Sequence, residues 1–229
     1  KTVNGKTEPD IVPFNANNFG SLFENGKKGI RHSVPLSYSF KALRFFTVSP
    51  SISYEEKWYF EKLDWKYDVI NNTPTLIAAD TIREFNRISN YSFSTSFNTR
   101  LYGMYSFKKG SVKAIRHVIN PSISFNYTPD FTKNDNYFQA VNQNGKIFYK
   151  SRHEGFVYGP SNTGKSGSIG FGLGNTLEMK VKSEKDSVSR KVSLLNNLSI
   201  GSSYNLVADS FKLANFGISA NTNILNGKF

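Results

Sequence analysis

The sequence predicts an all-β protein: an antiparallel transmembrane β-barrel, of which the chain supplies a partial wall of about seven strands. Three features lead to this prediction. Apolar and polar residues alternate over long stretches, the polar side of the alternation carries small residues, and the links between these stretches differ greatly in length. Side chains of a strand point to opposite faces at every second residue, so each stretch is expected to form a strand with one apolar face and one polar face.

The longest alternating stretch covers residues 91–107, with mostly aromatic and aliphatic residues at the odd positions and mostly polar residues at the even ones. The stretches 168–179, 198–206 and 216–224 repeat the pattern, and their second face consists mainly of Gly, Ser, Asn and Thr. A soluble β-sandwich would expose more Lys and Glu there to protect its solubility and its edges. Small polar residues instead suit a water-filled lumen or a crowded barrel wall, so we expect lipid to cover the apolar face.

Taken in order, the chain starts with a polar segment, 1–29, that is expected to be a loop or a frayed first segment. The barrel wall is expected over 30–229. Its predicted strands are 31–41, 45–58, 88–107, 112–128, 167–182, 192–207 and 213–225. The links 59–87 and 129–165 are predicted to be long loops, whereas the other links are short. Outer-membrane barrels combine long extracellular loops with short periplasmic turns, and soluble sandwiches rarely need such long structureless links.

Local signals refine this assignment. Helical spacing predicts a short helix in the first long link, at Ala78, Ile82 and Phe85. In the second, Asn144-Gly145 predicts a small hairpin. The prolines at positions 35, 50 and 121 lie inside predicted strands. Because proline has no N–H to donate, each is predicted to mark a strand start, a bulge or locally open pairing.

The composition restricts the class of protein and its partners. No apolar run approaches the ~20 residues of a membrane-spanning helix, which excludes an α-helical membrane protein. The 29 Lys and Arg against 17 Asp and Glu give a net charge of +12, which favours a polyanionic partner: nucleic acid, anionic lipid or a phosphorylated glycolipid. A basic surface without a partner is the alternative. The absence of cysteine excludes disulfides and thiol metal sites. The chain begins at Lys1 without Met or a signal peptide and ends at Phe229, and we expect a processed chain or a piece of a longer one.

The motifs do not predict catalysis. Residues 159–166 match the phosphate-binding pattern G-x-x-x-x-G-K-[ST], but a glycine-rich alternating stretch follows where that motif needs a helix, so a flexible loop is predicted. The histidines lack metal-ligand spacing: they are His32, His117 and His153. No nucleophile–histidine–acid arrangement can be argued. The sequence therefore predicts no enzyme, no metal and no cofactor.

Two segments, 115–131 (IRHVINPSISFNYTPDF) and 155–160 (GFVYGP), together with the glycine-alternating strand after them, carry a family resemblance. They resemble LptD-type outer-membrane lipopolysaccharide assembly proteins of the Bacteroidetes kind. The resemblance implies a large barrel in the outer membrane of a Gram-negative bacterium, which takes lipopolysaccharide from a periplasmic bridge protein and inserts it into the outer leaflet. It also implies an LptE-like lipoprotein plug in the lumen and a lateral seam between the first and last strands. The chain departs from the family in having too few strands for the whole barrel, no recognisable periplasmic jelly-roll domain and no cysteine.

The leading hypothesis is therefore a wall segment of a lipopolysaccharide translocon. Basic residues on or near the strands are candidates for contacts with the phosphates of the glycolipid: Arg31, Arg100, Arg116, Lys180 and Lys182. Solvated charge is the alternative for each of them. Another large outer-membrane barrel (a porin, a nutrient receptor or a secretion translocon) is the next hypothesis, followed by a soluble secreted β-sandwich that binds glycans. Nucleic-acid binding is not favoured, because the aromatic residues lie opposite the polar positions rather than along a basic face.

Overall fold

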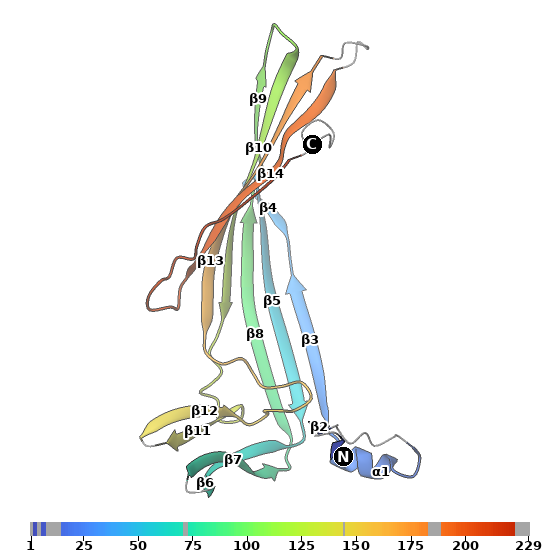
Figure 1. Ribbon diagram of the computed structural model, residues 1–229, viewed down its shortest axis with the longest axis vertical. Coiled ribbons are helices and arrows are strands. Elements are labelled where there is room, and N and C mark those ends of the chain that lie inside the picture. Colours follow the sequence, from blue (N-terminus) through green and yellow to red (C-terminus); the bar gives the residue numbers. More distant parts are fainter. Residues whose placement is uncertain are drawn as a thin grey trace.

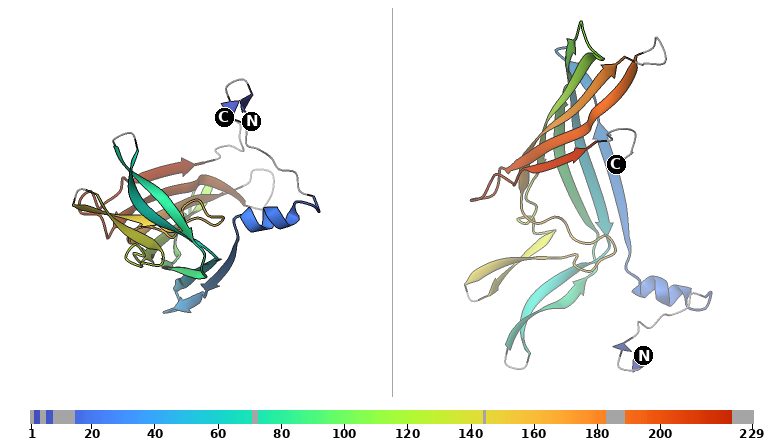
Figure 2. Two further views of the ribbon diagram at one scale, coloured as in Figure 1. Left: turned by 90° about the horizontal axis from the view of Figure 1, so that it is seen from below. Right: turned by 45° about the horizontal axis from the view of Figure 1, so that its top comes forward.

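The computed structural model describes residues 2–3, 6–7, 15–70, 73–143, 145–182 and 189–222. The main feature of this part of the chain is one long, twisted antiparallel sheet (Figures 1 and 2). Its strands are β3 (Gly29–Ser37), β4 (Phe40–Ala42), β5 (Phe46–Tyr59), β8 (Asn86–Asn98), β9 (Leu101–Ser106), β10 (Val112–Thr128), β13 (Ser166–Val181), β14 (Arg190–Asn205) and β15 (Gly217–Asn221). Their spatial order, β15-β14-β13-β10-β8-β5-β3, follows the chain order, and among the described strands β3 and β15 do not pair with each other. The prediction of an all-β, antiparallel, partial barrel wall is confirmed.

The nine strands follow seven paths, because β3 and β4 both pair with β5, and β8 and β9 both pair with β10. Two prolines explain these interruptions. Tyr38 donates its N–H to the Pro50 carbonyl (3.1 Å), and Thr99 donates to the Pro121 carbonyl (3.2 Å). In an antiparallel ladder each of these pairs would exchange a second bond, but proline has no N–H to complete it. The path breaks at 38–39 between β3 and β4 and at 99–100 between β8 and β9, so open pairing at these two prolines is confirmed.

Pro35 has another explanation. The N–H of Tyr38 points toward β5, and backbone nitrogens along a strand point alternately toward and away from a neighbouring strand. The nitrogen of Pro35, three residues earlier, therefore points away from β5. β3 is the edge strand among the described strands. A proline is tolerated on an edge strand with its nitrogen outward, so the pairing of Pro35 with Ser53 stays regular.

Two hairpins extend from one end of the sheet (Figure 1). The first consists of β6 (Lys62–Ile70) and β7 (Thr73–Ile82), and the second of β11 (Phe138–Gln143) and β12 (Lys146–Ser151). The hairpin predicted around Asn144-Gly145 is therefore confirmed. The short helix predicted at 78–85 is wrong, because β7 extends through Ile82 and pairs with β6. Three apolar residues at helical spacing are a weak helix signal. Pairing of this segment with β6 determines its structure instead.

The first 29 residues include the helix α1 (Phe19–Asn25) and the two-residue strands β1 (Thr2–Val3) and β2 (Lys6–Thr7). In the part of the chain that the structure describes, no helix has the length and apolar character needed to span a membrane.

The sheet has the two faces that the alternation predicts. Phe97, Ile123 and Phe171 stand directly opposite one another on three neighbouring strands and share the apolar face. This face is not covered: Phe97 is 42% exposed and Ile123 is 53% exposed. A soluble sandwich would bury such residues against a second sheet. The uncovered apolar face is instead the pattern expected of a barrel wall in lipid.

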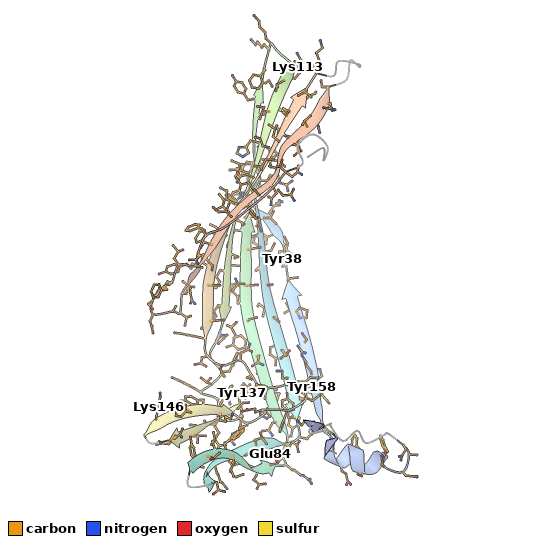
Figure 3. All side chains as sticks on the ribbon, viewed as in Figure 1. Tyr38, Glu84, Lys113, Tyr137, Lys146 and Tyr158 are labelled. Atoms are coloured by element: carbon orange, nitrogen blue, oxygen red, sulfur yellow. The ribbon has the colours of Figure 1, made fainter. Side chains whose placement is uncertain are left out.

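The buried core is small and lies at the hairpin end of the sheet. Its main cluster consists of Tyr59, Ile88, Tyr137 and Phe138, with Phe131 and Phe156 packed against it, while Val48 and Val118 are buried separately within the sheet. Figure 3 places Tyr137 and Tyr158 at this end and Lys113 at the opposite, short-turn end. The Tyr137 hydroxyl accepts a bond from the Ser89 N–H (2.8 Å), which lies beyond the point where β10 stops pairing with β8. The hairpin end is therefore held by side chains of the long links.

Candidate functional site

The polar face is a smooth surface of small side chains. A Cβ atom at Gly170 would lie 2.6 Å from Ser124 Oγ, so only glycine fits there without a shift of that side chain. Neighbouring strands are bridged by hydroxyl pairs, as between Ser51 and Ser94 (2.6 Å). These short hydroxyl groups satisfy one another and keep the face low between the strands that they bridge. A face of this kind can border a passage for a large polar molecule.

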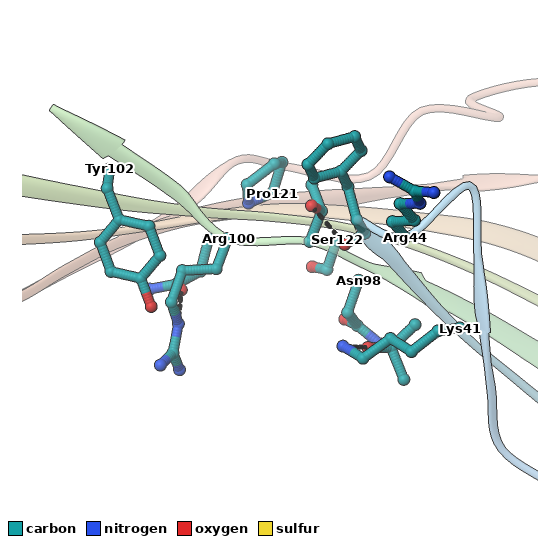
Figure 4. A pocket seen from close by; sticks show the side chains of 11 residues that line it. Lys41, Arg44, Asn98, Arg100, Tyr102, Pro121 and Ser122 are labelled. Atoms are coloured by element: carbon teal, nitrogen blue, oxygen red, sulfur yellow. Dashed lines mark hydrogen bonds between the residues drawn. The ribbon is translucent and has the colours of Figure 1, made fainter.

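A basic hollow of about 660 Å³ opens where the wall is interrupted (Figure 4). It lies between the β4–β5 turn and the break that separates β8 from β9. Its lining consists of Lys41, Arg44, Phe45, Thr47, Asn98, Thr99, Arg100, Tyr102, Asn120, Pro121 and Ser122. The turn at 43–45 is tight, with left-handed backbone at Leu43 (φ 48°) and Arg44 (φ 65°), as a short hairpin turn between right-twisted strands requires. Because this turn stops short of β9, the hollow stays open.

Three cations line the hollow, and no carboxylate does. Lys41 Nζ donates to Thr47 Oγ1 (2.6 Å), and Arg100 Nε donates to Asn120 Oδ1 (3.0 Å). Figure 4 shows Lys41 and Arg100 extending to the same side of the strands, with Arg44 on the other side. The sequence contains no Asp or Glu in 37–54 or in 85–129, which together supply the whole lining. Cations held by neutral partners and free of carboxylates can bind phosphate groups, and the guanidinium of arginine suits them especially well.

A second, smaller hollow of about 150 Å³ lies nearer the short-turn end. It is lined by Met104, Ala114, Arg116, Glu178, Met179, Lys180 and Lys191. Arg116 donates to Glu178 Oε2 (2.6 Å), so one of its three cations already has an anionic partner. The remaining two lysines give this hollow a net positive charge as well.

At the other end, the segment 152–162, here called the strap, lies against the polar face. Lys57 Nζ donates to the Pro160 carbonyl (3.1 Å), and the Tyr59 hydroxyl donates to the Gly159 carbonyl (2.9 Å). His153 is fully buried and stacks on Tyr59 with ring centroids 4.8 Å apart. Burial lowers the pKa of His153 to about 4, and the nearby charges of Arg152, Lys62 and Lys57 act in the same direction. The strap includes the start of the 159–166 motif, which runs into strand β13 without a helix, as the sequence predicted.

The family model described as LptD protein matches residues 2–229. The chain belongs to the LptD protein family. Members of this family are outer-membrane proteins of Gram-negative bacteria with a role in lipopolysaccharide transport and outer-membrane assembly. Neither the curated proteins nor the solved structures give a match. Outer-membrane barrels carry an apolar band on their outer surface, so we expect the exposed apolar face of the sheet to be the transmembrane surface.

The five predicted contact residues are spread along the wall. Arg116 and Lys180 lie together at the second hollow, and Arg100 lies at the first. The backbone N–H of Lys182 donates to the Ser111 carbonyl (2.8 Å), beside the short turns. Arg31 lies near the hairpin end and is ion-paired with Glu55.

Sequence reasoning missed Lys41, Arg44 and Lys191. The first two lie near a tight turn, where a charge is usually solvated, and only the short reach of that turn makes them neighbours of Arg100. The absence of acidic residues from 37–54 and 85–129 is the signal that could have identified them.

Proposed function

We propose that this chain forms part of the wall of an outer-membrane translocon that transports lipopolysaccharide and inserts it into the outer leaflet. The observation that carries the proposal is the contrast between the two faces. One face is apolar and uncovered, whereas the other is small, polar and interrupted by a basic hollow without carboxylates. The wall acts by guiding and sorting its substrate, without covalent chemistry.

The unequal connections give the wall a direction. Short turns of outer-membrane barrels lie on the periplasmic side and long loops on the extracellular side. The turns at 43–45 and 107–111, and the ends of β13 and β14 at Val181 and Arg190, are then periplasmic, and the two hairpins with the strap are extracellular. Both basic hollows lie toward the periplasmic end, where a phosphorylated glycolipid arrives first. Arg100, Lys180 and Lys182 are the proposed phosphate contacts, whereas Arg31 and Arg116 would meet the headgroup only after they leave Glu55 and Glu178.

The family resemblance supplies the proposed partners. An LptE-like lipoprotein plug would lie against the smooth polar face, since its Gly, Ser and Asn side chains allow close approach. A periplasmic bridge protein would deliver lipopolysaccharide at the short-turn end. A porin is the second candidate, and the open polar face alone would suit it. The strap favours the translocon, because it lies across the polar face and would narrow a diffusion pore.

The test uses the intact protein with its whole barrel, reconstituted in vesicles with its delivery partners. The double variant Lys41→Gln and Arg100→Gln should slow the delivery of lipopolysaccharide by about fivefold, which corresponds to ~1 kcal/mol for partly solvated charged hydrogen bonds. The matched control is Lys146→Gln with Arg83→Gln. It removes the same amount of positive charge at the hairpin end, from β12 and from the residue that follows β7. Equal rates for the two double variants would refute the role of the basic hollow. Ion conductance of porin size without lipopolysaccharide delivery would refute the translocon.

A further inference from the structure

Strand β9 has an open edge. It pairs with β10 along its length, but the neighbouring path ends at the 43–45 turn, since β5 begins at Phe46 and pairs with β8 from Thr47 onward. No described strand lies along the other edge of β9. The N–H groups of Thr99 and Phe107 donate to β10. By the alternation of a strand, the N–H groups of Tyr102, Met104 and Ser106 therefore point to the open edge.

Both faces of this strand are apolar and exposed. Leu101 (53% exposed) and Tyr105 (67%) lie on the apolar face of the sheet, while Tyr102 (65%) and Met104 (75%) lie on the other. An exposed apolar strand with an open edge pairs readily with other extended chains, and natural proteins usually shorten, charge or cover such edges. Lipid tails cannot replace the missing partner, because they offer no groups that bond to N–H or C=O. The edge therefore suits another extended polypeptide.

The charge around β9 restricts the partner further. Arg100 precedes the strand, Lys108 and Lys109 follow it, and the whole stretch 85–129 contains no Asp or Glu. Glu178, which reaches this end of the sheet from β13, is already bonded to Arg116. A second copy of the chain pairing edge to edge in antiparallel fashion would bring Arg100 against Lys108 and Lys109. Like charges directly opposite destabilise a strand pair, so a second copy is disfavoured.

We propose that β9 is a strand-addition site for an extended, acidic segment of a partner protein at the short-turn end of the wall. Six residues of β9 span about 20 Å at ~3.3 Å per residue, so a segment of about six to eight residues fills the edge. The main-chain bonds to Tyr102, Met104 and Ser106 supply the affinity. Acidic residues at the ends of the segment meet Arg100 and the two lysines, and apolar side chains between them cover Tyr102 and Met104 on one face and Tyr105 on the other.

The experiment uses the intact protein in lipid nanodiscs and a labelled synthetic peptide, acetyl-Asp-Glu-Val-Thr-Val-Thr-Glu-Asp-amide. A second peptide with Lys in place of every Asp and Glu is the charge control. We expect the acidic peptide to bind at least tenfold more tightly than the basic one. It should slow amide hydrogen exchange at Tyr102, Met104 and Ser106, whereas Gly103 and Tyr105, whose N–H groups point toward β10, should change little.

Two variants at one position separate backbone from side-chain recognition. Met104→Pro removes an N–H that points to the open edge and leaves the β9–β10 ladder in place, so it should weaken peptide binding about tenfold or more. Met104→Ala keeps the N–H and should weaken binding less than threefold. Equal binding of the two peptides, or equal effects of the two variants, would overturn the proposal. So would crosslinking of two barrels through a cysteine placed at Ser106, because the edge would then belong to a second copy.

Discussion

The assignment of the two faces makes a quantitative prediction on strand β14. Ile200 stands between Leu173 and Ile218 on the apolar face, and the adjacent Ser199 stands between Gly174 and Ser219 on the polar face. Arginine at Ile200 would place a charge in the lipid, which costs roughly 2–4 kcal/mol near the middle of the bilayer. Arginine at Ser199 would lose the hydroxyl pair with Ser219 (2.6 Å), worth about 0.5–1.5 kcal/mol. The expected difference between these neighbouring substitutions is therefore about 1–3 kcal/mol.

The measurement is the equilibrium folding of the intact barrel in lipid vesicles as a function of urea concentration, followed by the electrophoretic mobility of the folded form. Ile200→Gln is the control that separates charge from polarity, since it should cost clearly less than Ile200→Arg. The same comparison on β10 uses Ile123→Arg and Ser122→Arg. Equal costs at both members of a pair, or a larger cost at the serine, would mean that lipid does not cover the apolar face.

Two further predictions concern the strap and the polar face. His153 has a pKa of about 4 in the folded protein against about 6.5 when exposed, so the contribution of its burial is complete above pH ~6.5 and is lost as the pH falls toward ~4, by at most ~3 kcal/mol. The protection factors of the strap amides, which remove the pH dependence of intrinsic exchange, should therefore fall over that range in the wild type and stay nearly constant in His153→Phe. The same fall in both would refute the role of the histidine. Gly170→Ala should destabilise the barrel in urea titrations, because its Cβ would meet Ser124 Oγ at 2.6 Å, and Ser124→Gly should restore about 1 kcal/mol. Additive effects of these two substitutions would show that the contact is not what limits the site to glycine.

The alternation was sufficient to predict the wall because each strand has two chemically different faces. All seven predicted strands correspond to strand paths, and the interruptions follow from Pro50 and Pro121, whose missing N–H groups are visible in the sequence. The hairpin β6–β7 was missed although β6 alternates, with Leu63, Trp65, Tyr67 and Val69 at every second position. Its partner β7 carries apolar residues at mixed spacing and is fixed by pairing with β6. The strap was not predictable either, because its place depends on bonds to Lys57 and Tyr59, about a hundred residues earlier.

Only part of the basic hollow could likewise be predicted from the sequence. Arg100 could be selected from the sequence because it is a basic residue on the polar side of an alternating stretch. Lys41 and Arg44 could not be selected, because their distance from Arg100 depends on the register of β5 against β8. This register places the 43–45 turn beside the break at 99–100. A shift of that register by two residues would keep the same faces and yet move Lys41 and Arg44 along the wall. Periodicity therefore predicts which face a residue lies on, but it does not predict the register of two paired strands.

The early end of the β4–β5 turn relates the basic hollow to the open edge of β9. β5 and β8 do not continue beyond the turn, whereas β9, β10, β13 and β14 extend past it into the upper part of Figure 1. The first hollow is formed by side chains on either side of the 43–45 turn. The open edge of β9 is formed by backbone N–H groups beyond that turn. Neutralising Lys41 and Arg44 leaves Arg100 and the N–H groups of β9 intact, and Ser106→Pro leaves every residue that lines either hollow in place. A loss of lipopolysaccharide delivery in the first variant with unchanged peptide exchange protection, and the reverse in the second, would establish two separate sites created by one short turn.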